Sequence, residues 1–301
     1  MRRLSLAVGA GDAGERLDRF VAARGGISRG LARRALDAGG VFLDGRRCKV
    51  AGRSLRAGQR VVVNLEEGGR VPTSGPALDR GRLLHADADL AALDKPAGLP
   101  SQATLTGDRG TLPDLAARLL GGKVEIVHRL DRETSGVVVV ARTRKAAAAL
   151  AEAFRRGTPE KTYLALCARA PEPPEGRIDA PIGKDPRRAG SRRVAPGGDA
   201  AATRYRTLAS GPGAALVEAR PETGRTHQIR VHLAHLGAPL LGDPRYGGPR
   251  RVGGVEVHRV MLHAFRLAIA HPATGETMTF EAPVPVDFRE VERALLQATQ
   301  R

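Results

Sequence analysis

The sequence predicts an α+β protein in two parts. Over residues 83–301, short apolar segments typical of strands are mixed with helical segments, without the regular strand–helix alternation of a doubly wound fold. Residues 66–82 are rich in Gly, Pro and Ser and have no apolar periodicity, so we expect a linker there. The 301 residues therefore divide into an N-terminal module, 1–65, and a larger body, 83–301, in a chain long enough to form a core without disulfides.

The N-terminal module is expected to fold as two helices followed by a hairpin. Apolar residues at helical spacing define the first helix, and Ser28 is a suitable N-cap for the second, which ends at the two glycines 39–40. An Asp-Gly turn at 44–45 follows the apolar run 41–43 and predicts a hairpin. The apolar positions of the two helices are Leu17, Phe20 and Val21, then Leu31, Ala35 and Leu36, and residues 61–63 are the expected closing strand.

The second helix of this module is basic along one side. Arg33 and Arg34 follow Arg29 by four and five residues, a spacing that suits contact with phosphates. A solvated helix face is the alternative. The expected RNA contacts in this module are Ser28, Arg29 and Arg33.

The net charge indicates a nucleic-acid partner. Lys and Arg number 49 and Asp and Glu 32, which gives a charge of +17, and the pI is about 11.2. Only six of the basic residues are Lys. Compositional drift in a GC-rich genome would explain Arg in place of Lys, but it does not explain the excess of basic residues.

Several classes of protein are not expected. No apolar run approaches about 18 residues, so no membrane span is expected, and Asp12 and Glu15 interrupt the stretch that a twin-arginine export signal at Arg2 and Arg3 would need. The two cysteines form neither a metal-ligand spacing nor a disulfide framework, which points to a reducing, cytoplasmic compartment. Aromatic residues make up 3% and include no Trp, so RNA binding should depend on Arg, backbone amides and shape.

The larger body is expected to begin with two buried strands and an Ala-rich helix. A further strand, a long irregular stretch rich in Pro, Gly and Arg, and two more strands follow, before a last helix with a capping box at Asp287 and Glu290. In order, these elements are 90–94, 137–141, the helix 145–156, 163–167, the irregular stretch 169–200, 216–220, 260–270 and the helix ending at 296.

The first motif with chemical character is His-Arg-Leu-Asp-Arg-Glu-Thr-Ser-Gly at 128–136. It places Asp131 between Arg129 and Arg132, on a loop that enters a buried strand. Neighbouring cations favour the ionised carboxylate, which can act as a nucleophile or a base. A structural salt bridge is the alternative that these residues leave open.

The second motif runs from 220 to 237 and continues as Gly-Asp-Pro-Arg-Tyr-Gly at 242–247. A Gly-containing turn leads into a helix with apolar Ile229, and such an entry presents backbone amides and Arg225 to an anion. Three histidines lie in this segment, but their spacing is not that of a helical zinc motif, and no metal is expected. The third motif is Lys-Thr-Tyr at 161–163, where Tyr163 taken alone would be an ordinary core residue.

These motifs, in this order, resemble the RluA-like family of pseudouridine synthases over about residues 82–297. The two longer blocks correspond to the family's signature, together with Asp-Lys-Pro-Ala-Gly-Leu at 94–99 and Lys-Thr-Tyr-Leu-Ala at 161–165. Residues 15–65 resemble the alpha-L RNA-binding domain shared by a ribosomal protein and tyrosyl-tRNA synthetases. The resemblance implies a pseudouridine synthase catalytic fold with a mixed, mostly antiparallel central sheet, preceded in the chain by a small RNA-binding domain.

The resemblance also implies a reaction and roles for particular residues. Such enzymes detach uracil from ribose, turn it and rejoin it through carbon 5, without a metal or cofactor. Asp131 is then the catalytic carboxylate, either attacking the sugar or removing a proton from ribose carbon 2, and Arg225 its ionic partner. Tyr163 is the expected base for the carbon-5 proton, Arg129 the expected RNA contact that helps to hold the target nucleotide out of the stack, and Ile229 the residue that packs on the base.

The target and the assembly state are less defined. Ribosomal RNA of the large subunit is the expected partner, transfer RNA the alternative, and monomer the expected state. A basic cluster at Arg187, Arg188, Arg192 and Arg193 is either an RNA contact or a loop without fixed structure. The competing functions are a catalytically silent RNA-binding or ribosome-assembly factor and a glycosidic-bond hydrolase, although a hydrolase would require a second acid near Asp131.

Overall fold

The computed structural model describes residues 2–65, 77–102 and 110–296. The chain forms two compact units, residues 1–77 with 99–118 and residues 78–98 with 119–301. Most of the predicted linker 66–82 lies outside the described residues, and the predicted boundaries at 65 and 83 stay predictions.

The N-terminal unit contains the predicted helix–helix–hairpin and one further strand. Ser28 caps the second helix by accepting a hydrogen bond from the Leu31 N–H (3.1 Å), and Gly39 ends it with a φ of 84°. The four strands pair in the order β1-β4-β2-β3, so the N-terminal residues form an edge strand that the sequence reading did not include. The elements are β1 (Arg2–Ala7), α1 (Leu17–Gly25), α2 (Arg29–Ala38), β2 (Val41–Leu43), β3 (Arg46–Arg47) and β4 (Arg60–Leu65), and α3 (Leu112–Leu120) begins in the segment 99–118.

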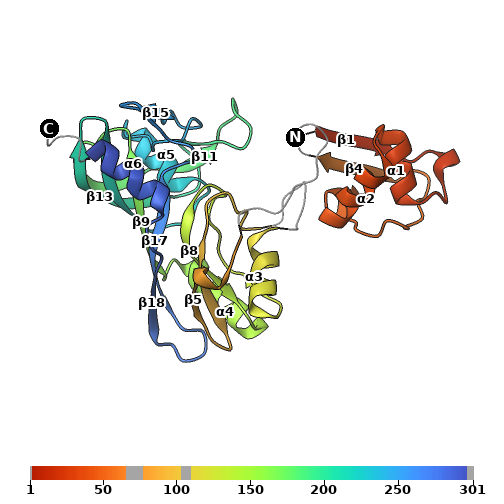
Figure 1. Ribbon diagram of the computed structural model, residues 1–301, viewed down its shortest axis with the longest axis horizontal. Coiled ribbons are helices and arrows are strands. Elements are labelled where there is room, and N and C mark those ends of the chain that lie inside the picture. The colour runs from red at the N-terminus through yellow and green to blue at the C-terminus, as the bar shows by residue number, and fades with distance from the viewer. Residues whose placement is uncertain (1, 66–76, 103–109, 297–301) are drawn as a thin grey trace. The chain divides into compact units, whose positions relative to one another are not determined.

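The larger unit is built on a ten-stranded sheet, shown in Figure 1. Its strands follow the order β10-β13-β14-β9-β17-β8-β6-β5, with β18 beside β17 and β7 beside β8. Every pairing is antiparallel except that of β8 with β17, which confirms the mixed, mostly antiparallel sheet implied by the resemblance. The elements of this unit are β5 (Leu83–Ala86), β6 (Leu90–Lys95), β7 (Glu125–Ile126), β8 (Ser135–Ala141), α4 (Arg144–Arg156), β9 (Glu160–Cys167), β10 (Glu175–Asp179), β11 (Ile182–Lys184), β12 (Arg192–Val194), β13 (Ala202–Gly211), β14 (Ala214–Pro221), α5 (Gln228–His235), β15 (Arg251–Val252), β16 (Val255–Glu256), β17 (Leu262–Ala270), β18 (Thr277–Glu281) and α6 (Val286–Leu296).

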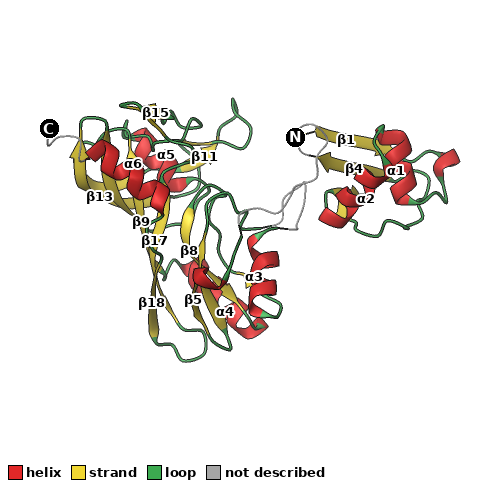
Figure 2. Ribbon diagram, in the orientation of Figure 1, coloured by secondary structure: helices red, strands yellow, loops and turns green. Residues whose placement is uncertain are grey.

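Helices cover both faces of this sheet (Figure 2). Successive side chains of a strand point to opposite faces. On β9, Ala165 packs in the apolar cluster that contains Ile229 and Leu233 of α5, whereas Leu166 packs with Phe288 of α6. The alternation therefore places α5 and α6 on opposite sides of β9.

Two details of the larger unit differ from the sequence-based expectations. The stretch 169–200 is not irregular throughout, because it contains β10, which pairs with β13, and the hairpin of β11 and β12, which pair with each other. The predicted capping box at Asp287 is not the way that α6 begins. Asp287 lies inside the helix, and its carboxylate accepts hydrogen bonds from the Arg259 guanidinium, including one of 2.9 Å from Nη2.

The glycine that ends the first motif is required by the fold. Gly136 has a φ of 114°, and it faces Ala264 where β8 and β17 run parallel. A Cβ on residue 136 would lie 2.2 Å from the Ala264 carbonyl oxygen, so any side chain would separate the two strands. The close strand contact fixes the end of the loop that carries Asp131.

The buried histidine at the same strand junction predicts acid sensitivity. The Ser135 hydroxyl lies 3.0 Å from His263 Nδ1, and His263 Nε2 lies 3.2 Å from the Ala282 carbonyl oxygen, which fits a neutral ring that accepts from Ser135 and donates to Ala282. Burial lowers the pKa of His263 to about 4. The unfolded chain binds a proton near pH 6.5 and the folded chain only near pH 4, so stability falls as the pH drops between these values, by about 3 kcal/mol.

Denaturant unfolding at pH 7.5 and pH 4.5 tests this prediction. A His263→Gln variant keeps an acceptor and a donor but does not titrate, so its stability should fall less than that of the wild type over this range. An equal loss in both proteins would show that other groups cause the acid sensitivity.

Candidate active site

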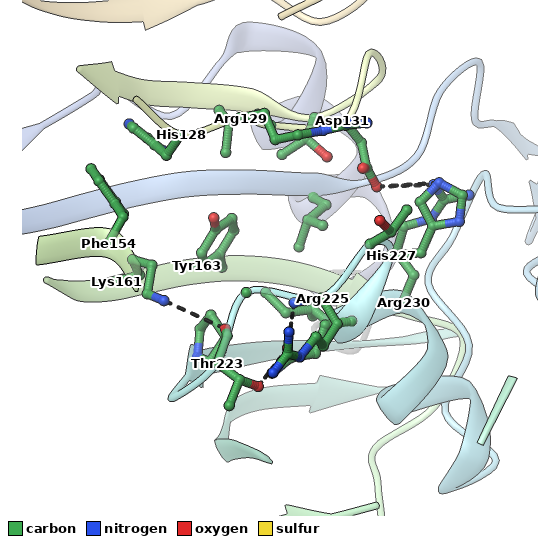
Figure 3. Close-up of a pocket in the computed structure, with 18 of the residues that line it drawn as sticks. His128, Arg129, Asp131, Phe154, Lys161, Tyr163, Thr223, Arg225, His227 and Arg230 are labelled. Carbon is green, nitrogen blue, oxygen red and sulfur yellow. Dashed lines mark hydrogen bonds and ion pairs between the residues drawn. The ribbon is translucent and has the colours of Figure 1, made fainter. Parts of the chain in front are cut away.

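The larger unit contains a pocket of about 360 Å³. The loop before β8, the first half of β9 and the loop into α5 form its walls, so all three sequence motifs meet there. Figure 3 shows Asp131, His227 and Arg230 at one end of the pocket, His128, Phe154 and Lys161 at the other, and Tyr163 between them.

The loop that carries Asp131 is held by three hydrogen bonds to the segment 95–98. The Arg132 carbonyl accepts hydrogen bonds from the Gly98 N–H (2.8 Å) and from the Lys95 ammonium (3.1 Å), and Arg132 Nε donates to the Gly98 carbonyl (3.0 Å). Lys95 is fully buried, and burial lowers its pKa to about 7 despite the nearby charges of Glu133 and Asp131. Its motif was visible in the sequence, but only the fold shows that Lys95 supports the Asp131 loop.

The ionic partner of Asp131 is Arg230, not Arg225 as the sequence suggested. Arg230 Nη1 donates to Asp131 Oδ2 at 3.1 Å. The other side of the guanidinium binds Asp243 with two hydrogen bonds, of 2.7 Å from Nε and 2.8 Å from Nη2. Burial alone would lower the pKa of Arg230, but the hydrogen bonds to Asp243 and the charges of both carboxylates raise it. Arg230 is therefore a permanent cation fixed between two carboxylates.

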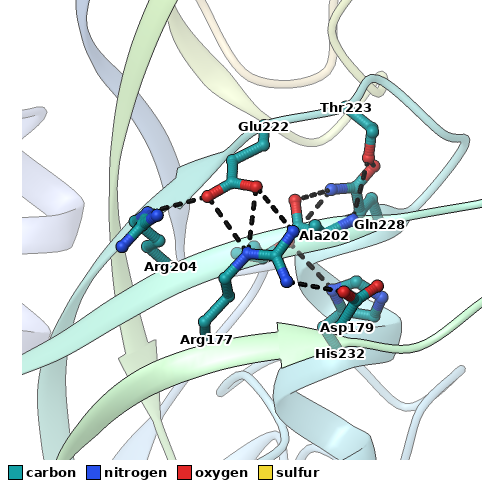
Figure 4. A network of polar contacts seen from close by, with 9 residues as sticks. Arg177, Asp179, Ala202, Arg204, Glu222, Thr223, Gln228 and His232 are labelled. Carbon is teal, nitrogen blue, oxygen red and sulfur yellow. Dashed lines mark hydrogen bonds and ion pairs between the residues drawn. The ribbon is translucent and has the colours of Figure 1, made fainter.

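Arg225 shapes the loop instead. Its Nε donates to the Ala200 carbonyl (3.0 Å), and its main-chain N–H donates to Gln228 Oε1 (2.9 Å). The Gln228 side chain also binds the main chain of β13, because its Nε2 donates to the Ala202 carbonyl at 2.9 Å (Figure 4). Both arginines lie in the motif at 223–232, Arg225 in the loop before α5 and Arg230 within α5. Their spacing along the chain did not distinguish which of them reaches the carboxylate.

A salt-bridge network supports the strand that leads into this loop. Glu222, directly after β14, accepts hydrogen bonds from Arg177 of β10 (2.9 Å) and Arg204 of β13 (2.7 Å), as Figure 4 shows. Exposed ion pairs contribute little singly, but this network joins three adjacent strands immediately before Thr223.

His227 lies beside Asp131 and was not predicted to be near it. Its Nε2 is 3.8 Å from Asp131 Oδ2, and its Nδ1 is 2.6 Å from the Tyr246 hydroxyl. Burial lowers the pKa of His227, against the opposing effect of the Asp131 charge. The Tyr246 hydroxyl also accepts a hydrogen bond from the Arg192 N–H (3.0 Å), which connects the site to the basic hairpin of β11 and β12.

Tyr163 and Ile229 both line the pocket, and Figure 3 shows Tyr163 between its two ends. Both pack in one apolar cluster, with Ile229 buried and Tyr163 partly buried. Burial and the charge of Asp131 raise the pKa of the Tyr163 phenol. Arg129 is exposed at the pocket rim.

The arginines predicted to bind RNA in the N-terminal unit surround one buried carboxylate. Arg29 and Arg33 both donate to Asp18 Oδ2, at 3.1 Å and 3.0 Å, and Arg16 donates to Oδ1 at 3.1 Å. Asp18 is fully buried, while the side chains of Arg29 and Arg33 are about half exposed. The cluster therefore fixes the positions of cations whose outer edges face solvent, and Ser28 acts as the cap of their helix.

Neither a metal site nor a membrane-spanning helix is found among the residues that the structure describes. No group of three or more His, Cys, Asp or Glu side chains there is arranged to hold a metal ion. No helix among those residues is both long enough and apolar enough to span a membrane.

Comparison with known proteins identifies both units. A profile of the RNA pseudouridylate synthase family matches residues 89–235, and a profile of the S4 domain matches residues 15–61. An uncharacterized RNA pseudouridine synthase of Chloroflexus aurantiacus is 42% identical over 293 residues, which cover 93% of this chain and 90% of that protein. A protein of Mycobacterium bovis with the same description is 37% identical over 303 residues, covering 97% of each chain.

Solved structures agree with these sequence relationships. Human RNA pseudouridylate synthase domain containing 4 is 31% identical and has a TM-score of 0.59, covering 70% of this chain and 91% of that one. The expected family, fold class and RNA partner are confirmed. The chain belongs to the RNA pseudouridylate synthase family: it is an isomerase of RNA with an S4 RNA-binding domain at its N-terminus.

Proposed function

We propose that this protein converts uridines of large-subunit ribosomal RNA to pseudouridine, with Asp131 as the catalytic carboxylate. The observation that carries the proposal is the Asp131 carboxylate held at 3.1 Å by the permanent cation Arg230, inside a pocket that Tyr163 and Ile229 also line. A carboxylate in a fixed position and next to a cation is suited to attack on ribose or to proton removal from it.

The isomerisation balances without a redox partner. The bond from ribose C1′ to uracil N1 breaks, and a bond from C1′ to C5 forms. The C5 hydrogen leaves as a proton, and N1 gains one. Because the base must turn, the nucleotide has to leave the RNA stack, which costs a few kcal/mol. Basic groups around the pocket, among them Arg129 and Arg225, would offset this cost through phosphate contacts.

Ribosomal RNA is proposed because two features favour an extended RNA. The net charge of +17 supports contact with many phosphates. The S4 domain adds two further cations, Arg29 and Arg33, which are not among the residues of the pocket. Transfer RNA is the alternative substrate.

Tritium release tests the function and the substrate together. Ribosomal and transfer RNA from cells lacking the gene, labelled with tritium at uridine C5, are incubated separately with the protein. We expect release from ribosomal RNA. Release from transfer RNA alone would contradict the proposed substrate, and no release from either would contradict the isomerase function.

Tyr163 is proposed to accept the C5 proton, which predicts a pH dependence. The raised pKa means that the phenol is protonated at neutral pH, whereas a base must be ionised. The phenolate fraction then grows about tenfold per pH unit below the pKa, so the single-turnover rate should rise from pH 6.5 to pH 8.5.

A Tyr163→Phe variant should keep RNA affinity within about twofold and lose about 10²- to 10⁴-fold in rate, which is the usual contribution of a general base. Single-turnover tritium release at several pH values measures both effects. A flat profile in the wild type, or a Phe variant with an unchanged rate, would leave Tyr163 as a packing residue only.

A further inference from the structure

The end of the pocket away from Asp131 contains a lysine that the proposed chemistry does not use. Lys161 and Tyr163 are two residues apart on β9, so their side chains point to the same face of the sheet. Both line the pocket, and Figure 3 shows Lys161 on the far side of Tyr163 from Asp131. A base that extends from Asp131 across Tyr163 would therefore direct its far edge towards Lys161.

The surroundings of the Lys161 ammonium leave most of its hydrogen-bonding capacity unused. Among the described residues, its one hydrogen bond is a long one, of 3.4 Å, to the Thr223 carbonyl oxygen. An ammonium group has three N–H donors. The neighbouring pocket walls include the side chains of Val127 and Phe154, and burial lowers the pKa of Lys161. A partly buried cation in such a setting is suited to a ligand that accepts hydrogen bonds.

His128, which lines this end of the pocket, gives the Lys161 ammonium no negatively charged partner. His128 stacks on Phe154 with ring centroids 4.2 Å apart, and its Nε2 accepts a hydrogen bond from the Val139 N–H (2.9 Å). Burial, and to a smaller degree the charge of Lys161, lowers the pKa of His128 to about 3, so the ring is neutral. His128 forms a rigid wall and leaves Lys161 as the donor.

A donor and an acceptor are thus placed side by side. Within the part of the chain that the structure describes, the Thr223 carbonyl has no hydrogen-bond donor other than Lys161. The Gln228 side chain positions this loop through hydrogen bonds of 2.7 Å to the Thr223 hydroxyl and 2.9 Å to the Arg225 N–H. The acceptor is therefore held in place next to the ammonium.

This pair is complementary to the imide edge of uracil. That edge presents N3–H, a donor, between two carbonyl acceptors, O2 and O4. The Thr223 carbonyl matches N3–H, and the Lys161 ammonium matches a flanking carbonyl. Cytosine has an acceptor at N3 and an amino donor at C4. Its N3 would face the Thr223 carbonyl oxygen, which is also an acceptor, and its amino group would face the Lys161 ammonium, which is also a donor. Binding of cytosine would therefore leave buried polar groups without partners, which is unfavourable.

From this juxtaposition, and resting on the proposed function, we infer that Lys161 and the Thr223 carbonyl bind the imide edge of the target uracil. Lys161 thereby becomes a determinant of base specificity. A phosphate is the other ligand that a lysine attracts, but here a fixed carbonyl oxygen lies 3.4 Å from the ammonium and would repel it. Phosphate binding is therefore an outcome for the test to exclude.

The test combines a substitution in the protein with a substitution in the RNA. The substrate is a large-subunit ribosomal RNA transcript containing uridine, 2-thiouridine or 4-thiouridine, since sulfur is a weaker acceptor than oxygen. The enzymes are the wild type, Lys161→Met and Lys161→Arg, with Lys145→Met as a control on the exposed surface of α4. The C-linked nucleoside is measured by chromatography after digestion, and kcat/KM is compared.

We expect Lys161→Met to lose about 10- to 100-fold in kcat/KM on uridine RNA, as for removal of a hydrogen bond from a charged donor. One of the two thio substitutions should lower the kcat/KM of the wild type about tenfold. The same thio substitution should lower the kcat/KM of Lys161→Met less than about twofold. Any effect of sulfur on RNA folding is the same for both enzymes and cancels in this ratio. Lys161→Arg should retain part of the wild-type sensitivity to the thio substitution, and Lys145→Met should retain all of it.

Equal thio effects in the wild type and in Lys161→Met, at both positions, would overturn the inference. If Lys161 binds a phosphate instead, the thio effects will be equal in this way. In addition, the plot of log affinity for RNA against log salt concentration will be shallower by about one unit of slope in Lys161→Met. If the wild type does not isomerise the uridine transcript at all, the proposed function fails. If it does so without coupling to Lys161, only the inference about Lys161 fails.

Discussion

An Asp131→Asn variant should lose about four orders of magnitude or more in isomerisation rate while it still folds and binds RNA. The substitution keeps the size of the side chain and an oxygen that can accept from Arg230, but it removes the charge that the proposed role of Asp131 requires. Loss of a nucleophile or an essential base commonly has effects of this size. Tritium release under single-turnover conditions measures the rate, and a filter-binding assay measures RNA affinity.

The matched control is Asp179→Asn, which makes the same chemical change at an exposed position of β10. Its rate should stay within about threefold of the wild type. Asp131→Asn at more than a tenth of the wild-type rate would exclude Asp131 as the catalytic carboxylate.

Replacing Arg230 should affect both activity and stability, whereas replacing Arg225 should affect neither strongly. In Arg230→Met, Asp131 loses its only charge-assisted hydrogen bond among the described residues, and the buried Asp243 is left without its partner. Displacement of a catalytic group costs about 100-fold in rate, and an uncompensated buried charge costs about 3–5 kcal/mol in the free energy of unfolding. Arg225→Met removes a hydrogen bond from an exposed side chain to a main-chain carbonyl, so we expect less than a tenfold loss in rate.

Rate measurements and denaturant unfolding of the two variants decide which arginine serves Asp131. The double variant Arg230→Met/Asp243→Leu separates the two effects, because it removes both buried charges. Its stability should return to within about 2 kcal/mol of the wild type, while its activity stays low. Full activity in the double variant would show that Arg230 only neutralises Asp243.

The contrast between the two arginines illustrates what a sequence motif can specify. The motif at 223–232 contains both arginines, and the family resemblance implied that Arg225 is the one that pairs with Asp131. Which of them reaches the carboxylate depends on the geometry at the start of α5. His227 adopts a left-handed φ of 60° just before that helix, and Arg230 then lies on the helical turn that faces both Asp131 and Asp243.

Local signals explain why most elements could be predicted. The cap at Ser28, the glycine at 39 and the Asp-Gly turn at 44–45 act over a few residues, and the structure contains each of them. By contrast, β1 and β10 were missed because they pair with strands far along the chain, such as Arg2 with Leu65 and Glu175 with Arg206. The hairpin of β11 and β12 was missed because its strands have only three residues each, in a segment rich in Pro, Gly and Arg.

The sequence by itself therefore determined the α+β class and the family, since these are encoded in local patterns and ordered motifs, and it predicted Asp131 as the carboxylate of the site. Only the tertiary structure decided the partners of that carboxylate, the support from Lys95 and the pairing of Lys161 with the Thr223 carbonyl. The physical reason is distance along the chain. Asp131 and Arg230 are 99 residues apart and Lys161 and Thr223 are 62 apart, so their contacts depend on strand register and helix packing, which no local pattern encodes.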